Sequence, residues 1–216
     1  MKKIFLSVVF CFAFLNAYLQ QDQEAKKILD KVSDKTKAYS TIQVKFKLTV
    51  DDRKEKTSSD SEGLIMIKGD KYRLETGQNL IIYDGKTMWS IALDIKEATI
   101  TEPDMEDDDF ISNPAKILTW YNRDFKYRYV QQVAKEGISM HEIDLFPNNL
   151  NQPYSRIKVM ISEKELLLHS VKSVGKEGID YSVKLTDYII NKEIGDDMFI
   201  FNSEKYKKFE LIDMRF

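Results

Sequence analysis

The residues that could carry out chemistry are few in this sequence and lie far apart. Its 216 residues include two histidines, His141 and His169, and one cysteine, Cys11. The spacings that define a zinc protease, a redox cysteine pair, a serine nucleophile or a phosphate-binding loop do not occur. A single histidine inside a strand pattern is usually a packed or solvated side chain, so we assign neither histidine a catalytic or metal-binding role.

Two acidic runs are the remaining candidates for chemistry. Asp107-Asp108-Asp109 lacks the alternating oxygens, glycine and distal glutamate of a calcium-binding loop, and we interpret it as solvated. Asp196 and Asp197 are adjacent residues, whereas the carboxylates of a glycosidase face each other across a cleft. The sequence therefore predicts no enzyme, catalytic residue, metal or cofactor. A secreted β-rich hydrolase with acids gathered from distant strands stays open as an alternative.

The charges are balanced along the chain. The 33 basic and 35 acidic residues give a net charge of −2. Without a basic stripe the chain is a poor candidate for binding nucleic acid. It also has no polybasic segment that would hold it on anionic lipid.

The N-terminus has the layout of a secretory signal peptide. Lys2 and Lys3 precede an apolar run from Ile4 to Leu15, and the polar Gln20–Glu24 follows. The run of about 12 apolar residues is shorter than the roughly 18 that indicate a membrane span; a buried core helix is the alternative. We expect residues 1–20 to be a signal peptide and residues 21–216 to form a single soluble domain. Bulky Phe10 before Cys11 argues against lipidation.

The remaining pattern predicts a mainly β, α+β fold. Apolar residues recur at helical spacing from Asp22 to Ser40, and those from Ile42 to Val50 alternate with polar ones. Asp51–Ser61 is expected to be a turn, and Asn113–Tyr121 a short second helix. Further strands are expected at residues 63–68, 71–75, 79–83, 86–93, 98–102, 126–133, 139–146, 155–162, 165–174, 180–190 and 198–202. Together these predict a curved antiparallel sheet of about 11 or 12 strands with two helices over one face.

Several segments, taken in order, resemble the outer-membrane lipoprotein carrier family. The most specific is Asp84-Gly85-Lys86-Thr87-Met88-Trp89, which follows the similar segments Gly63–Lys68 and Lys71–Glu75. Asn113–Leu118 resembles the mid-chain helix of that family, and Asp197–Phe201 resembles its terminal Phe-x-Phe strand. The resemblance extends over residues 24–202.

This resemblance implies an incomplete antiparallel β-barrel whose hydrophobic concave face is closed by a helical lid. It also implies the function of this family, whose members are periplasmic, non-enzymatic carriers that shuttle acylated lipoproteins from the inner to the outer membrane. The implied partners are an inner-membrane lipoprotein-releasing transporter and an outer-membrane receptor, with the carrier a monomer. A same-fold envelope lipid sensor or regulatory binding protein is the alternative. An acyl chain contributes about 0.8 kcal/mol per buried CH₂, so such a carrier needs a large apolar cavity.

The lipid-binding cavity is predicted from apolar positions in these segments. The residues expected to line it are Ile28, Val32, Val44, Phe46, Leu64, Met66, Leu74, Ile82, Met88, Ile117 and Leu118. Ordinary core is the alternative for each, because core and cavity lining follow the same alternation. Trp89 is expected to pack on the outer side of its strand.

One turn departs from the family pattern. Where many members have an Arg-Pro that fastens the lid, this chain has Lys68-Gly69-Asp70-Lys71. Lys68 is expected to replace that arginine as a lid contact, although an ammonium lacks the planar fork of a guanidinium.

Overall fold

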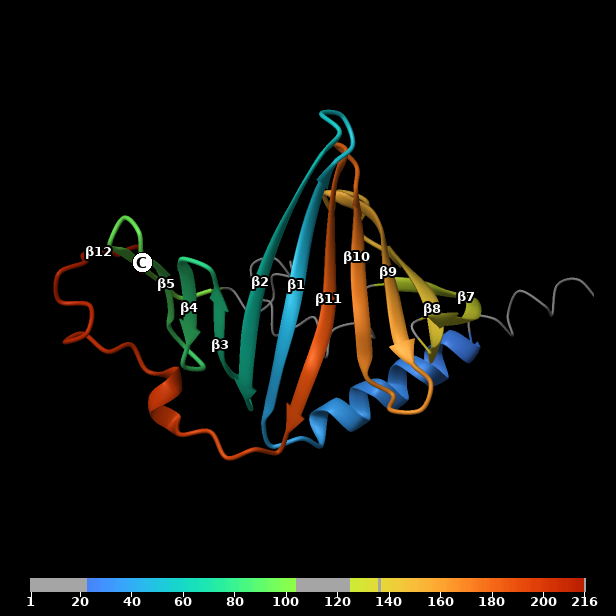
Figure 1. Ribbon diagram of the computed structural model, residues 1–216, viewed down its shortest axis with the longest axis horizontal. Coiled ribbons are helices and arrows are strands. Elements are labelled where there is room, and N and C mark those ends of the chain that lie inside the picture. The colour runs from blue at the N-terminus through green and yellow to red at the C-terminus, as the bar shows by residue number, and fades with distance from the viewer. Residues whose placement is uncertain (1–22, 104–124, 136, 216) are drawn as a thin grey trace, which may run out of the picture.

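The computed structural model describes residues 23–103, 125–135 and 137–215, which form one large sheet (Figure 1). The sheet has 12 strands in the order β12-β6-β5-β4-β3-β2-β1-β11-β10-β9-β8-β7. Neighbouring strands are antiparallel except for β12, which runs parallel to β6. Because β7 and β12 are the two ends of this order, the sheet is open, and the predicted incomplete antiparallel barrel is confirmed.

The strands are β1 (Ile42–Asp52), β2 (Thr57–Lys68), β3 (Lys71–Thr76), β4 (Asn79–Tyr83), β5 (Met88–Ala92), β6 (Glu97–Thr101), β7 (Phe125–Lys135), β8 (Ile138–Pro147), β9 (Tyr154–Ser162), β10 (Leu168–Gly175), β11 (Ile179–Ile190) and β12 (Glu210–Asp213). An N-terminal helix covers residues 23–37, and a short 3-10 helix, η2, covers Asp196–Phe199. The second helix expected at Asn113–Tyr121 lies outside the described residues.

The N-terminal helix packs one side against the sheet. Ala25, Ile28, Leu29 and Val32 are buried at helical spacing and belong to the main hydrophobic cluster, together with Val44 and Phe46 of β1. The cluster extends over β7–β11 on one side of β1 and over Ile65 of β2 on the other. We call the side of the sheet that faces this helix the helix face, and the opposite side the outer face.

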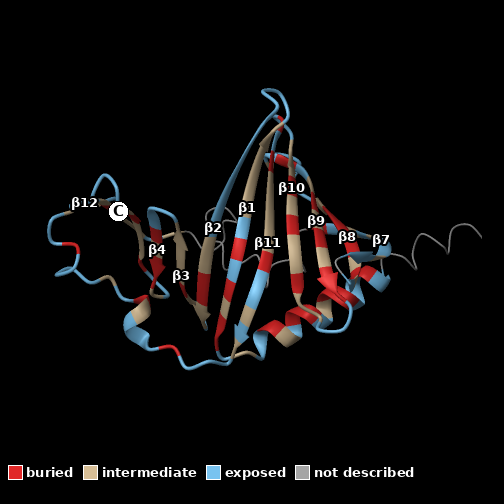
Figure 2. Cartoon of the chain, viewed as in Figure 1, coloured by how far each residue is buried: buried red, intermediate tan, exposed pale blue. Residues whose placement is uncertain are grey.

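The outer face of the other half of the sheet is covered by the C-terminal segment, residues 191–209. Figure 1 shows this segment leaving β11 and running past β3 and β4 toward β12. Ile194 and Phe199 bury Met66 of β2, and Tyr206 joins Ile82 of β4 in a further cluster. The C-terminal segment therefore buries the outer face of this half, whose helix face also carries the buried Tyr72 and Tyr83. Figure 2 shows buried residues along strands in both halves of the sheet.

The first hairpin is longer than predicted, and the expected turn at Asp51–Ser61 is wrong. Pairing continues to Asp52 and Thr57, although most side chains near the tip are exposed. Backbone groups form the ladder, so polar side chains do not interrupt it. Asp52 Oδ1 accepts hydrogen bonds from the amides of Lys54 (2.8 Å) and Glu55 (3.0 Å), which fixes the turn.

Two further expectations in the C-terminal half need correction, and one strand there was not expected. Residues 198–202 form no strand, because η2 turns the chain so that Phe199 packs on the outer face. The strand expected from Glu165 begins at Leu168, after a turn. β12 was not predicted, since Glu210-Leu211-Ile212-Asp213 has no clear alternation and is defined by its pairing with β6.

Candidate lipid-binding face

An apolar belt crosses the helix face of β1–β5. One row of cross-strand neighbours joins Val44, Ile65, Leu74 and Ile81. The same row continues to Ser90 of β5 and Thr99 of β6, and these polar side chains end its apolar part. Ile65 is buried, and Leu74 and Ile81 are half-buried. Ile67 and Leu74 in this half of the sheet pack against the main hydrophobic cluster, which also contains the buried residues of the N-terminal helix.

A second row on the same face carries aromatic and sulfur groups. It joins Ile67, Tyr72, Tyr83 and Met88. The two tyrosine rings have centroids 5.3 Å apart, and the Tyr72 hydroxyl donates to Met88 Sδ at 3.3 Å. Burial raises the pKa of Tyr72 to about 12, so its hydroxyl stays neutral. The row is uncharged. Tyr72 and Tyr83 are buried, and Ile67 and Met88 are half-buried, so the accessible part of the row is apolar and suits an acyl chain better than a polar substrate.

Gly63 makes room for Phe46 on this face. The two residues are direct partners across β1 and β2. A Cβ atom at Gly63 would lie 2.3 Å from Phe46 Cζ and 2.4 Å from the backbone oxygen of Glu75. Glycine is therefore required at this position by the close approach of the ring, not by a turn.

The contact between the N-terminal helix and the sheet contains polar groups as well as apolar ones. Ser33 and Thr36 are buried on the sheet-facing side of the helix. Within the described residues the Ser33 hydroxyl has no hydrogen-bond partner. A buried, unpaired hydroxyl costs about 1–3 kcal/mol, so the helix is held less tightly than its apolar area suggests. At its C-terminal end Lys35 Nζ donates to the carbonyl oxygen of Glu165.

The structure divides the predicted cavity residues between the two faces. On the helix face lie Ile28, Val32, Val44, Phe46, Leu74 and Met88. On the outer face lie Leu64, Met66 and Ile82, packed against the C-terminal segment. These three residues do not share a surface with the others. Ile117 and Leu118 lie outside the described residues.

Lys68 points to the outer face and contacts the C-terminal segment. Its Nζ donates to the carbonyl oxygen of Ile194 at 2.9 Å and lies 3.2 Å from Asp196 Oδ1. Lys71 also contacts Asp196, at 3.3 Å, and the two lysines hold the pKa of Asp196 below its usual value. Lys68 thus binds a backbone carbonyl of the C-terminal segment, on the face away from the N-terminal helix, and its role as a lid contact stays a prediction. The prediction that Trp89 packs outward is confirmed, because its ring stacks on Phe201 with centroids 5.7 Å apart.

Sequence reasoning missed several helix-face residues. Ile65 and Ile81 lie in continuous apolar runs, where alternation does not indicate a face. Tyr72 could have been found, because Tyr72 and Leu74 flank the charged Arg73 and therefore share a face. Tyr83 ends the apolar run Leu80–Tyr83, where alternation again indicates no face.

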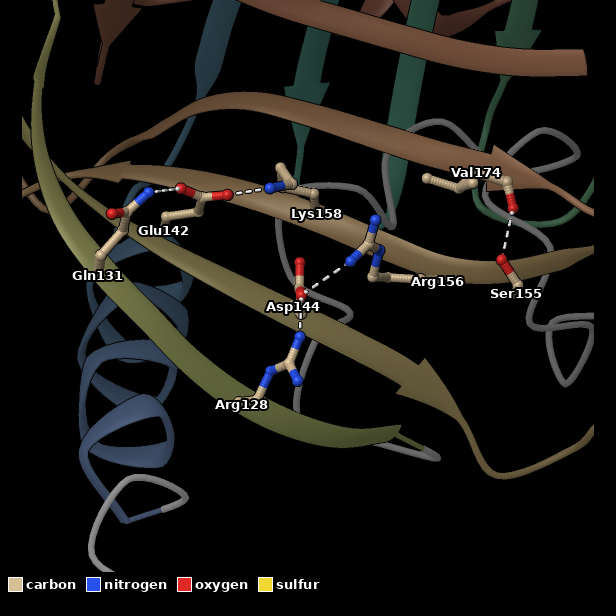
Figure 3. Close-up of polar contacts among 8 residues, drawn as sticks. All are labelled: Arg128, Gln131, Glu142, Asp144, Ser155, Arg156, Lys158 and Val174. Atoms are coloured by element: carbon tan, nitrogen blue, oxygen red, sulfur yellow. Dashed lines mark hydrogen bonds and ion pairs between the residues drawn. The ribbon is translucent and has the colours of Figure 1, made fainter. Parts of the chain in front are cut away.

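Two buried carboxylates on the outer face of β8 are occupied by ion pairs (Figure 3). Asp144 Oδ2 accepts hydrogen bonds from Arg128 (2.8 Å) and Arg156 (3.2 Å). Glu142 pairs with Lys158 and accepts from Gln131, and the lysine lowers the pKa of Glu142. A glycosidase acid needs a raised pKa, so Glu142 is not poised for that role.

Within residues 23–103, 125–135 and 137–215, no cluster of three or more potential metal ligands is present. No helix in the same ranges is long and apolar enough to cross a membrane.

An open, mainly antiparallel sheet with a helix packed on one apolar face defines a mainly β, α+β class of protein. Residues 37–202 match the model of the family described as outer membrane lipoprotein carrier protein LolA. The chain therefore belongs to this family, whose members are binding and carrier proteins.

One solved structure shares the fold at low sequence identity, and two others show a weaker similarity. An uncharacterized conserved protein from Thermus thermophilus is 12% identical, with a TM-score of 0.59 over 88% of this chain and 99% of that one. An outer membrane lipoprotein-sorting protein domain from Vibrio parahaemolyticus is 10% identical, with a TM-score of 0.46 over 85% of this chain and 99% of that one. The Pseudomonas aeruginosa MucA/MucB complex is 10% identical, with a TM-score of 0.42 over 84% of this chain and 62% of that one. No curated protein matches the sequence.

Proposed function

We propose that this protein is a periplasmic carrier that binds the acyl chains of lipoproteins on its helix face and moves them from the inner to the outer membrane. Family membership and the apolar belt on β1–β5 support this proposal. The observation that carries it is the half-buried state of Ile67, Leu74, Ile81 and Met88 on one uncharged face. Each buried CH₂ of a cargo chain would contribute about 0.8 kcal/mol there.

In this proposal the N-terminal helix is the described part of the lid. Cargo competes with Ile28 and Val32 for apolar sheet surface, so the helix must leave part of that surface when an acyl chain enters. The unpaired Ser33 hydroxyl lowers the free energy needed for this movement. The partners would be a releasing transporter in the inner membrane and a receptor in the outer membrane, and residues 1–20 would direct export.

Binding is tested with a triacylated peptide and variants on the two faces. Ile81→Ser and Met88→Ser remove apolar surface from the helix face, and Leu64→Ser removes it from the outer face of a nearby strand. All three residues are half-buried, which makes Leu64→Ser the matched control. We expect the first two variants to weaken binding about tenfold each. Equal losses in all three, or none, would contradict a helix-face site.

A second experiment separates a carrier from a sensor on the same fold. The protein is depleted in cells, and lipoproteins are located by fractionating the two membranes. Accumulation at the inner membrane supports transport. Unchanged sorting together with retained lipopeptide binding would instead support the sensor.

A further inference from the structure

The outer face of β1, β11, β10 and β9 carries a basic groove of about 330 Å³. Five lysines line it, namely Lys47, Lys135, Lys158, Lys172 and Lys184, while none of its described lining residues is acidic. The whole chain, in contrast, has a net charge of −2. Lys158, Lys172 and Lys184 are half-buried, so bulk water and salt screen them less than fully exposed lysines.

The strand register places these lysines against one another. Lys47 is the direct cross-strand partner of Lys184, and Lys172 is the direct partner of Lys158. Like charges directly opposite each other destabilise a sheet. Two such pairs on four adjacent strands concentrate positive charge at one place, and a bound anion would add a favourable partner for it.

Carboxylates outside the lining of the groove offset part of this charge. Lys47 pairs with Asp60 at 2.6 Å, and Lys172 pairs with Asp180 at 3.2 Å. Lys158 of β9 pairs with Glu142 of the neighbouring strand β8 (Figure 3). None of these three carboxylates belongs to the described lining, so an anion that enters the groove meets ammonium groups.

Hydroxyl groups lie between the lysines. Ser170 is the cross-strand partner of Lys184, and Ser182 is the partner of Lys172 on one side and of Thr49 on the other. Ammonium and hydroxyl groups together offer many donors. Planar bidentate recognition of a carboxylate favours arginine, whereas lysine binds phosphate as a point charge.

We propose that this groove binds a phosphate group, supplied by the headgroup of an anionic phospholipid or by a soluble phosphate ester. The phosphate oxygens would accept from Lys172, Lys184 and the Ser182 hydroxyl. The site is on the face opposite the acyl-chain belt, so it goes beyond carriage and either proposal can fail alone. A carrier with such a site could rest on an anionic membrane surface while the helix face exchanges cargo.

The test measures binding to two phosphate sources with the mature full chain. The probes are glycerol 3-phosphate, followed by calorimetry, and vesicles of phosphatidylglycerol in phosphatidylcholine, followed by co-sedimentation. The variant Lys172→Gln/Lys184→Gln is compared with Lys207→Gln/Lys208→Gln, which makes the same charge change at two exposed lysines of the C-terminal segment. We expect the groove variant to raise the Kd about tenfold or more and the control variant to leave it within about twofold.

The results with the two probes decide whether the site exists and which kind of phosphate it binds. Vesicle binding alone assigns the phosphate to a lipid headgroup, and binding of both probes or of the ester alone assigns it to a soluble group; either supports the site. Equal binding by the two double variants, equal binding to vesicles of pure phosphatidylcholine, or no binding of either probe by the wild type would overturn it. The Kd of Ser182→Ala is measured in the same way, so that the groove is still tested if the double lysine variant fails to fold.

Discussion

The two halves of this sheet are covered by different segments in different ways. The N-terminal helix lies on the helix face and brings Leu29 and Val32 into a mainly aliphatic cluster. The C-terminal segment lies on the outer face and brings Phe199, Phe201 and Tyr206 against β2–β6.

The polar contacts of the two segments differ as well. The C-terminal segment is bound by Lys68 and Lys71 at Asp196 and by Arg73, which donates to the carbonyl oxygen of Met198 at 3.5 Å. The helix instead buries the unpaired Ser33 hydroxyl. The C-terminal segment therefore combines apolar packing with ion pairs, whereas the helix packs mainly through apolar side chains and leaves one buried hydroxyl unpaired. If the protein is a carrier as proposed, the helix is the segment expected to move.

The largest expected effect comes from removing the centre of the outer cover. Phe199 is fully buried, so Phe199→Ala should lower the free energy of unfolding by about 3–5 kcal/mol. Urea unfolding followed by circular dichroism measures the loss. Ile200→Ala, at a neighbour that is 58% exposed, should change stability by less than about 0.5 kcal/mol. A similar small change for Phe199→Ala would mean that the C-terminal segment is not part of the core.

A smaller loss of stability is expected at Gly63, where Phe46 crowds the helix face. Gly63→Ala forces Phe46 and the strand backbone apart and should cost about 1–3 kcal/mol. The control is Ser61→Ala, an exposed position on the same face of β2, which should be nearly neutral. Thermal unfolding of both variants would show whether the close contact at Gly63 exists in solution.

The mobility of the helix is tested by Ser33→Ala. Removing the unpaired hydroxyl should stabilise the docked helix by about 1 kcal/mol, seen as slower amide exchange over residues 25–37 and slower release of a bound lipopeptide. Asp34→Ala, at the exposed neighbouring position, measures how much of the gain is helix propensity alone. If Ser33→Ala exchanges no more slowly than Asp34→Ala, the hydroxyl does not weaken docking.

The smallest effect is expected at the ion pairs of the outer cover. The pKa of Asp196 is lowered in the folded protein by hydrogen bonds from Lys68 and Lys71. A lowered folded pKa means that the carboxylate stabilises the protein fully above its ordinary pKa of 3.8, and that this contribution is lost as the pH falls through the lowered value. Asp196→Asn should therefore be less stable than the wild type near neutral pH, and the difference should shrink in acid. The stability of both proteins is measured at several pH values. A difference that grows in acid would contradict this assignment.

Sequence reasoning predicted the parts of the fold that have a clear period. In β1 the alternation of Val44 and Phe46 with Lys45 and Lys47 indicated both the strand and its buried face. It failed in Leu64-Ile65-Met66-Ile67, where both faces are covered and every residue is apolar. For that reason Leu64 and Met66 were predicted on the helix face, which Ile65 and Ile67 occupy instead.

The basic groove could not be predicted from the sequence at all. Lys47 and Lys184 are direct neighbours in space, yet they are separated by most of the chain. A scan for polybasic segments finds only charges that are close in sequence, so it misses lysines that strand pairing brings together.

The sequence by itself determined the local elements of this protein: the amphipathic helix, the strands with one polar side and the Asp84-Gly85 turn, where Asp84 Oδ1 accepts from the amides of Lys86 and Thr87. These depend on neighbours within a few residues, and periodicity records such neighbours. The tertiary structure alone decided which face each continuous apolar run buries, where the C-terminal segment packs and which lysines converge. Those outcomes depend on contacts between distant strands, and local spacing does not record them.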